Sequence, residues 1–133
     1  QKKVSGFAFF NYENIYKRFV GEFPEEYEYA TFEECLDTEH LAHNGYVVVA
    51  GYIAEMEIKK TKKGEMMARL TLEANYEFLE VMIFQQEYQQ LSDLLVAGRA
   101  NLLLINGVVS YDKRKENNIL RANYETNIVT LTL

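Results

Sequence analysis

Residues 59–84 read KKTKKGEMMARLTLEANYEFLEVMIF, a lysine-rich turn followed by two segments in which apolar and polar residues alternate. Alternation with a period of two is typical of a β-strand that buries one face. Residues 65–73 and residues 76–84 each place their core-type residues on one face: Met66, Ala68, Leu70 and Leu72 in the first, and Leu79, Val81 and Ile83 in the second. The stretch therefore predicts two successive strands with a turn at Ala74-Asn75.

The flanking sequence extends this pattern in both directions. A valine-rich segment, residues 46–59, predicts a long strand before the lysine turn, with Gly51 as a place to bend or bulge. Residues 85–97 have apolar residues at helical spacing and predict an amphipathic helix. Two further strands are expected, one at residues 101–111 with a bulge or kink at Asn106-Gly107, and one at residues 119–129.

Five strands with a helix between the third and the fourth is the order of an OB-fold barrel. We therefore expect a mainly β fold in which residues 46–133 form a five-stranded OB-fold domain. Residues 1–45 are expected to form a helical and irregular N-terminal extension that packs on the barrel. Within it, Asn11 or Asn14 is suited to cap a first helix, and Thr31 and Glu34 have the spacing of a capping box.

The composition is ordinary for a soluble globular protein. Of the 133 residues, 48% are hydrophobic and 26% are charged, and no apolar run approaches the roughly 18 residues of a membrane helix. No signal-peptide pattern follows Gln1 and no initiator Met precedes it, so we expect a fragment of a longer, cytoplasmic protein without membrane contact. The single cysteine, Cys35, cannot form an internal disulfide and favours a reducing compartment.

The net charge of −6 argues against a generic nucleic-acid binder, because such proteins are usually basic. The charge is uneven, however, at −5 over residues 1–45 and −1 over residues 46–133. Because phosphate binding depends on local potential, a focused lysine patch on the nearly neutral second segment can still bind a nucleic-acid backbone. Such binding is expected to be weak and salt-sensitive.

Several short motifs resemble those of a known family. They are Thr61-Lys62-Lys63-Gly64, Thr71-Leu72-Glu73 and Leu79-Glu80-Val81-Met82-Ile83-Phe84, followed after the predicted helix by Gly107-Val108-Val109-Ser110-Tyr111. Their order and spacing resemble the OB-fold domain of the alpha subunit of bacterial DNA polymerase III, over roughly residues 4–131. The lead-in at residues 6–11 is also similar, although the family's following His-Pro is absent. The acidic stretch 22–40 and the short turn at Ala74-Asn75 are further departures from the family.

The resemblance implies one non-catalytic domain of a much larger DNA-directed DNA polymerase, a nucleotidyltransferase whose metal-binding aspartates lie in a part that this chain does not contain. It implies contact with single-stranded template DNA during DNA replication, or with other domains and subunits of the polymerase. Two alternatives are a protein-interaction module that docks other replisome parts and an anticodon-binding OB domain of a tRNA synthetase. The function proposed from sequence is weak, sequence-tolerant binding of single-stranded DNA.

Candidate nucleic-acid contacts fall in three places. Lysine amines bind backbone phosphates without reading sequence, and aromatic rings and guanidinium planes stack on bases. The lysine turn contributes Lys59, Lys60, Lys62 and Lys63. The predicted outward face of the second and third strands contributes Arg69 and Phe78, with Tyr76 near the turn and with Met67, Thr71 and Met82 beside them. The loop before the last strand contributes Lys113, Arg114 and Lys115, supported by Arg121. A solvated hairpin tip, a Phe78 packed beneath residues 4–20 and a solvated loop are the structural alternatives.

No catalytic residue, metal site or cofactor is predicted. His40 and His43 are three residues apart with Cys35 and Asp37 nearby, but zinc sites usually need four ligands in tight pairs, so a chance cluster is favoured. The glutamates of residues 25–34 are best interpreted as a charged surface. Phosphate-binding and dinucleotide-binding glycine motifs are absent from the sequence.

Overall fold

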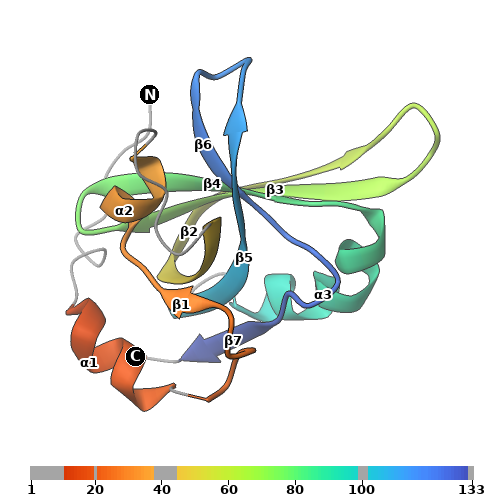
Figure 1. Cartoon of the computed structure of the whole chain (residues 1–133). Helices are drawn as coiled ribbons and strands as arrows, with labels where there is room; N and C mark the ends of the chain where they lie inside the picture. Colours follow the sequence, from red (N-terminus) through yellow and green to blue (C-terminus); the bar gives the residue numbers. More distant parts are fainter. Residues whose placement is uncertain (1–10, 20, 38–44, 99–101, 132–133) are drawn as a thin grey trace.

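The predicted strands close into a ring in the computed structural model, which describes residues 11–19, 21–37, 45–98 and 102–131 (Figure 1). The ring consists of β2 (Tyr46–Lys60), β3 (Met66–Ala74), β4 (Glu77–Ile83), β5 (Leu102–Asp112) and β6 (Asn117–Arg121). Neighbours pair in the order β2-β3-β4-β6-β5, and β5 pairs back onto β2. Among the pairings of these five strands, the one between β4 and β6 is parallel and the others are antiparallel. This closed ring of five strands, with α3 (Gln85–Gly98) between β4 and β5, confirms the predicted OB-fold architecture.

The interior of the ring holds the residues that the alternation predicts. Leu70, Leu72, Leu79, Val81 and Ile83 are almost completely buried in one cluster. Each such side chain contributes about 1.5–3 kcal/mol relative to exposure, so the buried face fixes the register of β3 against β4. The helix α3 packs against β3 and adds Leu91 and Leu95 to the same cluster. None of the described helices has the length and apolar composition needed to cross a membrane.

The N-terminal segment covers the outside of the barrel. Helix α1 (Tyr12–Arg18) is capped by Asn11, whose side chain accepts a hydrogen bond from the Asn14 amide at 3.2 Å. Phe23 and Tyr27 pack with Val48, Ala50, Leu102 and Leu104 in a second cluster, against which Ile15 and Phe19 lie. The strand β1 (Glu28–Tyr29) pairs in parallel with β2 and was not predicted.

Helix α2 (Phe32–Leu36) reaches further inward. The predicted capping box is present, because Thr31 and Glu34 exchange side-chain and backbone hydrogen bonds. Phe32 and Cys35 are buried in the barrel cluster, and α2 packs against β4 and β6. The side chain of Asn118 in β6 donates a hydrogen bond to the Cys35 carbonyl at 2.8 Å, so that α2 is attached to the barrel wall.

The last predicted strand, residues 119–129, is wrong as a single element. It divides into β6 and β7 (Ile128–Leu131). After β6 the chain ends its pairing with β4, and as β7 it pairs with the first half of β5. The buried Asn106 side chain stabilises the intervening turn, accepting from the Asn127 amide at 2.7 Å and donating to the Glu125 carbonyl at 3.2 Å. Asn106 thus forms no bulge, and β5 keeps its register with β2 through this position.

Two further local predictions are corrected. The register shift in β2 lies between Ile53 and Glu55 and not at Gly51, where a Cβ would come within 2.9 Å of the Phe32 ring. Gly51 is therefore required by close packing with α2. The turn between β3 and β4 is Asn75-Tyr76, both with positive φ, so Tyr76 belongs to the turn and does not begin the strand.

Candidate nucleic-acid interface

The outer face of the barrel carries three rows of side chains that run across the strands. Paired positions give a first row of Glu55, Thr71 and Glu80, a second of Glu57, Arg69, Met82 and Arg121, and a third that begins with Lys59 and Met67. Since neighbouring strands lie about 4.8 Å apart, the side chains of one row are in reach of one another. The rows therefore change from acidic to basic toward the lysine turn at residues 61–65.

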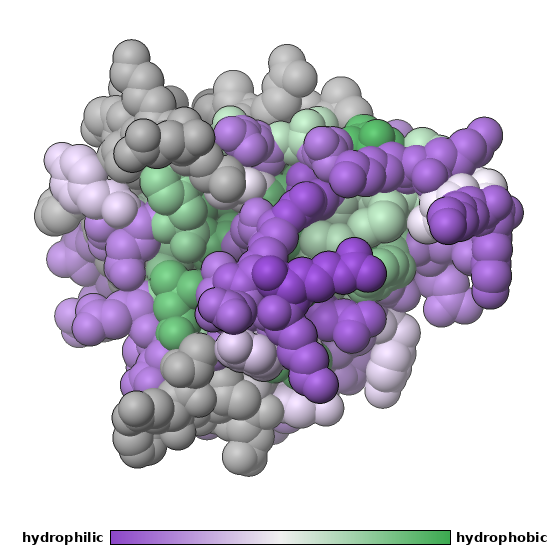
Figure 2. All heavy atoms as spheres, turned by 90° about the horizontal axis from the view of Figure 1, so that it is seen from above, coloured by the Kyte–Doolittle hydropathy of each residue, from purple (hydrophilic) through white to green (hydrophobic). Residues whose placement is uncertain are grey.

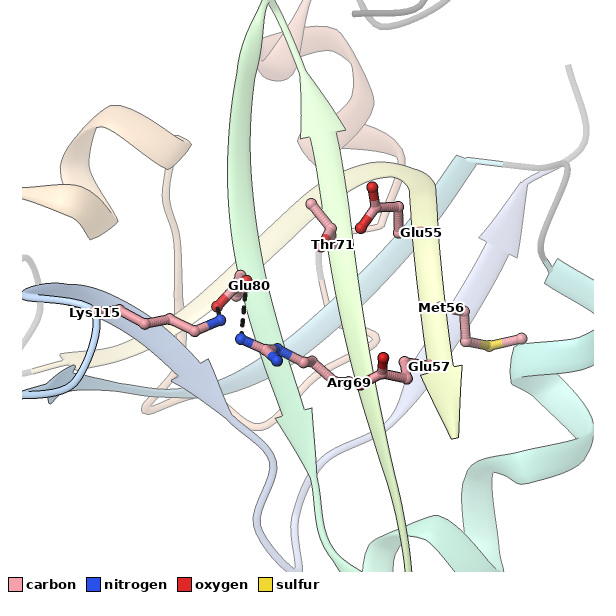
Figure 3. Close-up of a pocket in the computed structure, with 7 residues that line it drawn as sticks. All are labelled: Glu55, Met56, Glu57, Arg69, Thr71, Glu80 and Lys115. Carbon is pink, nitrogen blue, oxygen red and sulfur yellow. Dashed lines mark hydrogen bonds and ion pairs between the residues drawn. The ribbon is translucent and has the colours of Figure 1, made fainter. Parts of the chain in front are cut away.

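A groove follows these rows. Its first part, a hollow of about 630 Å³, lies over Glu55, Arg69 and Glu80 (Figure 3). It shares Glu57, Arg69 and Lys115 with a second hollow of about 310 Å³. The second shares Met82, Asp112 and Arg114 with a third of about 410 Å³. These three adjoining hollows are called the outer groove below.

Two hairpins border the outer groove. In Figure 1 the β2–β3 hairpin projects to the right and the β5–β6 hairpin projects upward from the barrel. Seen from above, hydrophilic side chains gather over the centre and right of the molecule, with a strip of hydrophobic surface between them (Figure 2). The apolar lining of the second and third hollows includes Met67, Met82 and Phe84. The second and third hollows thus combine charged side chains with an apolar part of their lining.

An ion-pair triad crosses the first hollow. Arg69 lies 3.5 Å from one carboxylate oxygen of Glu80, and the Lys115 ammonium donates to the other (Figure 3). The three side chains come from β3, β4 and the turn between β5 and β6, respectively. The triad therefore holds the β5–β6 turn against the strands at one edge of the groove.

The third hollow contains an aromatic and cationic platform. The guanidinium of Arg121 lies over the Phe84 ring, 5.0 Å from its centroid. Tyr111 is exposed and lines the same hollow with Lys113 and Arg114. Planar groups of this kind can stack on nucleic-acid bases, and the neighbouring cations can contact phosphates.

The lysine turn is well formed and exposed. The Thr61 amide donates to the Glu65 carbonyl at 2.8 Å, and the Gly64 amide donates to the Thr61 carbonyl at 2.9 Å. Gly64 has a φ of 83°, which a glycine adopts without steric cost. Lys59, Lys60, Lys62 and Lys63 are all exposed. Lys59 also lines the second hollow and pairs with Glu57 at 3.0 Å.

The structure brings most, but not all, of the sequence-predicted contacts together. Those that line the outer groove are Lys59, Arg69, Lys113, Arg114, Lys115 and Arg121. Tyr76, 66% exposed, and the half-buried Phe78 lie by the other turn of β3. A strand rises about 3.3 Å per residue. The 9 residues of β3 therefore separate Tyr76 and Phe78 from the lysine turn. In Figure 1 the hairpin of β3 and β4 turns at the left, opposite to the β2–β3 hairpin at the right. Thr71 lines the groove but is only 4% exposed, so it offers little surface to a ligand.

Sequence reasoning did not select Phe84, Tyr111 or Glu80. Phe84 and Glu80 share the outward alternation of Met82, so the period-two pattern already placed them on this face. Tyr111 ends a predicted strand, and nothing in its sequence neighbourhood distinguishes it. His40 and His43 lie outside the described residues, within which no group of three or more His, Cys, Asp and Glu side chains is arranged to hold a metal ion.

The ring of strands and the intervening helix define an OB-fold domain. The fold is similar to that of RecG in its structure bound to a three-way DNA junction, with a TM-score of 0.56 and 17% identity over 84% of this chain and 14% of RecG. It is also similar to that of a putative aspartyl-tRNA synthetase from Leishmania major Friedlin, with a TM-score of 0.57 and 11% identity over 90% of this chain and 26% of the synthetase. No protein-family model matches the sequence.

The sequence is related to DNA polymerase III subunit alpha of Aquifex aeolicus (strain VF5), with 27% identity over 114 residues. The match covers 86% of this chain and confirms the resemblance that the motifs indicated. This chain spans 9% of the length of that relative.

Proposed function

We propose that this OB-fold domain binds single-stranded DNA weakly along the outer groove, as a non-catalytic part of a replicative DNA polymerase. The observation that carries the proposal is the meeting of cations from both hairpins beside the apolar lining of the second and third hollows. A single strand offers phosphates on one side and unstacked bases on the other, so it needs both kinds of surface.

The distribution of charge favours the part of the groove nearest the lysine turn. The first row carries Glu55 and Glu80, whereas Lys60, Lys62 and Lys63 extend the basic surface beyond the third row. Because like charge repels a phosphate chain, the backbone is expected to follow the lysine turn and Arg114. The bases would then lie over Met67, Met82 and the platform of Phe84 and Arg121.

The relationship to DNA polymerase III subunit alpha supports the remaining parts of the proposal. We infer that the complete protein is a cytoplasmic DNA-directed DNA polymerase acting in DNA replication, and that this domain supplies none of its catalytic groups. Other domains and subunits of the polymerase would be its protein partners. Sequence-tolerant binding fits this setting, because a replicative enzyme must hold template of any sequence and phosphate contacts carry no sequence information.

A salt titration of oligo-dT binding tests the proposal. With about three phosphate contacts, the logarithm of the binding constant should fall against the logarithm of salt concentration with a slope near −2. Oligo-rU of the same length is the matched ligand. Undetectable binding of oligo-dT at low salt, or a slope of zero, would contradict DNA binding, and clear preference for oligo-rU would favour an anticodon-binding type of domain.

A further inference from the structure

Glu80 lines the first hollow of the outer groove, along which we propose that DNA binds. We infer that Glu80 masks Arg69 and Lys115, so that these two cations are withheld from phosphates and the groove binds a polyanion less tightly than its cation content allows. This inference rests on the proposed function, because it concerns how the outer groove meets a nucleic-acid backbone. On this inference Glu80 limits the affinity of the groove for nucleic acid, because it opposes the contact with phosphates and does not take part in it.

The geometry of the triad supports a mask. Both carboxylate oxygens of Glu80 are engaged, one by Arg69 and the other by Lys115 (Figure 3). The side chain of Glu80 is 16% exposed, and those of Arg69 and Lys115 are 30% and 28% exposed. Partly buried charges are screened less by salt than exposed ones, so the pairs persist at the ionic strengths at which a surface pair weakens.

A phosphate and the Glu80 carboxylate compete for the same donors. If a phosphate took either cation, the carboxylate would remain in the hollow as a partly uncompensated negative charge, with Glu55 and Glu57 nearby. Loss of one partner from a pair with restricted access to water is costly. The strand is therefore expected to contact the cations outside the triad. The lining of the first hollow, with three glutamates and two cations, keeps a net negative charge and excludes phosphate.

The triad also has a mechanical role. Lys115 belongs to the turn between β5 and β6, 35 residues from Glu80 in sequence, and its bond crosses the edge of the groove. Glu80 thus fixes the hairpin that carries Lys113 and Arg114. Replacement of Glu80 by Gln preserves the shape of the side chain and removes its charge, so it separates masking from the loss of packing.

The test measures oligo-dT binding of the full chain from 50 to 300 mM salt for wild type and Glu80→Gln. Release of two cations should steepen the slope from near −2 to about −3.4, and the affinity at 50 mM salt should rise on the order of tenfold. In the double variant Glu80→Gln with Lys115→Gln, the slope should be less steep than in Glu80→Gln by about 0.7, which identifies Lys115 as one released cation. Glu116→Gln is the control: it makes the same charge change next to Lys115 in the turn between β5 and β6, and it should leave the slope of the wild type unchanged.

The outcomes separate this inference from the proposed function. If wild type binds with a slope near −2 and Glu80→Gln matches it, masking is wrong and DNA binding stands. If wild type fails to bind and Glu80→Gln binds, masking is supported and the native groove is not a DNA site. If neither binds, both are overturned. Should thermal denaturation show that Glu80→Gln is unfolded, Glu80→Thr, whose β-branched side chain suits a strand position, carries the same expectations.

Discussion

The guanidinium carbon of Arg121 in β6 lies 5.0 Å from the centroid of the Phe84 ring, which follows β4. The two residues are 37 positions apart in the sequence and meet because β4 and β6 pair in parallel, with Met82 opposite Arg121. A guanidinium already held over an aromatic ring is a preformed surface for a base, so little conformational entropy is lost when a base adds to it.

Replacing Arg121 separates stacking from charge. Arg121→Ala should weaken oligo-dT binding roughly 5- to 150-fold, since base stacking on such a platform is worth about 1–3 kcal/mol, and should also reduce the salt slope by about 0.7. Arg121→Lys keeps the charge but loses the planar group, so it should weaken binding while keeping the slope. Tyr124→Ala, which removes an exposed aromatic ring outside the groove lining, is the control. Equal affinities for Arg121→Lys and wild type would show that the platform does not stack on bases.

The lysine turn distinguishes DNA binding from protein docking. The triple substitution of Lys60, Lys62 and Lys63 by Glu should abolish oligo-dT binding at moderate salt, because it replaces three phosphate-binding charges by repulsive ones. Lys17→Glu on α1 applies the same kind of charge change away from the groove and should have little effect. Assembly with the proposed polymerase partners should survive the triple substitution. Lost assembly with intact DNA binding would instead favour a protein-interaction module.

The barrel could be predicted from sequence where one face of a strand is buried. Leu70 and Val81 occupy alternating positions because the interior of the ring excludes polar side chains, so the pattern is visible in the chain itself. The strand β1 could not be predicted, because Glu28 and Tyr29 pair with β2 through backbone groups that any residue supplies. The break between β6 and β7 depends on the buried side chain of Asn106, which is distant in sequence.

The candidate site was predictable in composition but not in arrangement. Exposed cations such as Lys62 and Arg114 follow from their turn positions, and they border the groove as hairpin residues do. The pairing of Lys115 with Glu80 is a tertiary contact without a local signal. The alternation places Phe78 and Phe84 on the same face at opposite ends of the third predicted strand, and it does not indicate which end lies beside the basic loops. The choice of Phe78 as the stacking residue therefore had no support from the pattern. The topology places Phe84, and not Phe78, beside Arg121.

Gly107 is expected to be essential for the closure of the barrel. A Cβ at this position would lie 2.7 Å from the Arg121 carbonyl oxygen and 3.1 Å from Leu120 Cγ. Because the obstacle is the backbone of a paired strand, it cannot move aside, and Gly107→Ala should lower the free energy of unfolding by about 2–3 kcal/mol. Gly64→Ala meets no atom within 4 Å and should cost only about 1 kcal/mol, from its positive φ. Urea denaturation of both variants tests this, and equal losses would contradict the close approach of β5 and β6.

Cys35 should make the stability of the protein decrease at alkaline pH. Burial, with a smaller effect of Glu34, raises the pKa of the Cys35 thiol to about 12, from an ordinary value of 9.0. Between these values the unfolded chain loses the thiol proton and the folded chain keeps it, so unfolding becomes easier as pH rises above about 9. At pH 10 the loss should be about 1.4 kcal/mol relative to pH 8. Urea denaturation at pH 8, 9 and 10 measures it, and Cys35→Ala, although less stable throughout, should lack this decrease. An identical pH dependence in the two proteins would show that Cys35 is accessible to water in the folded state.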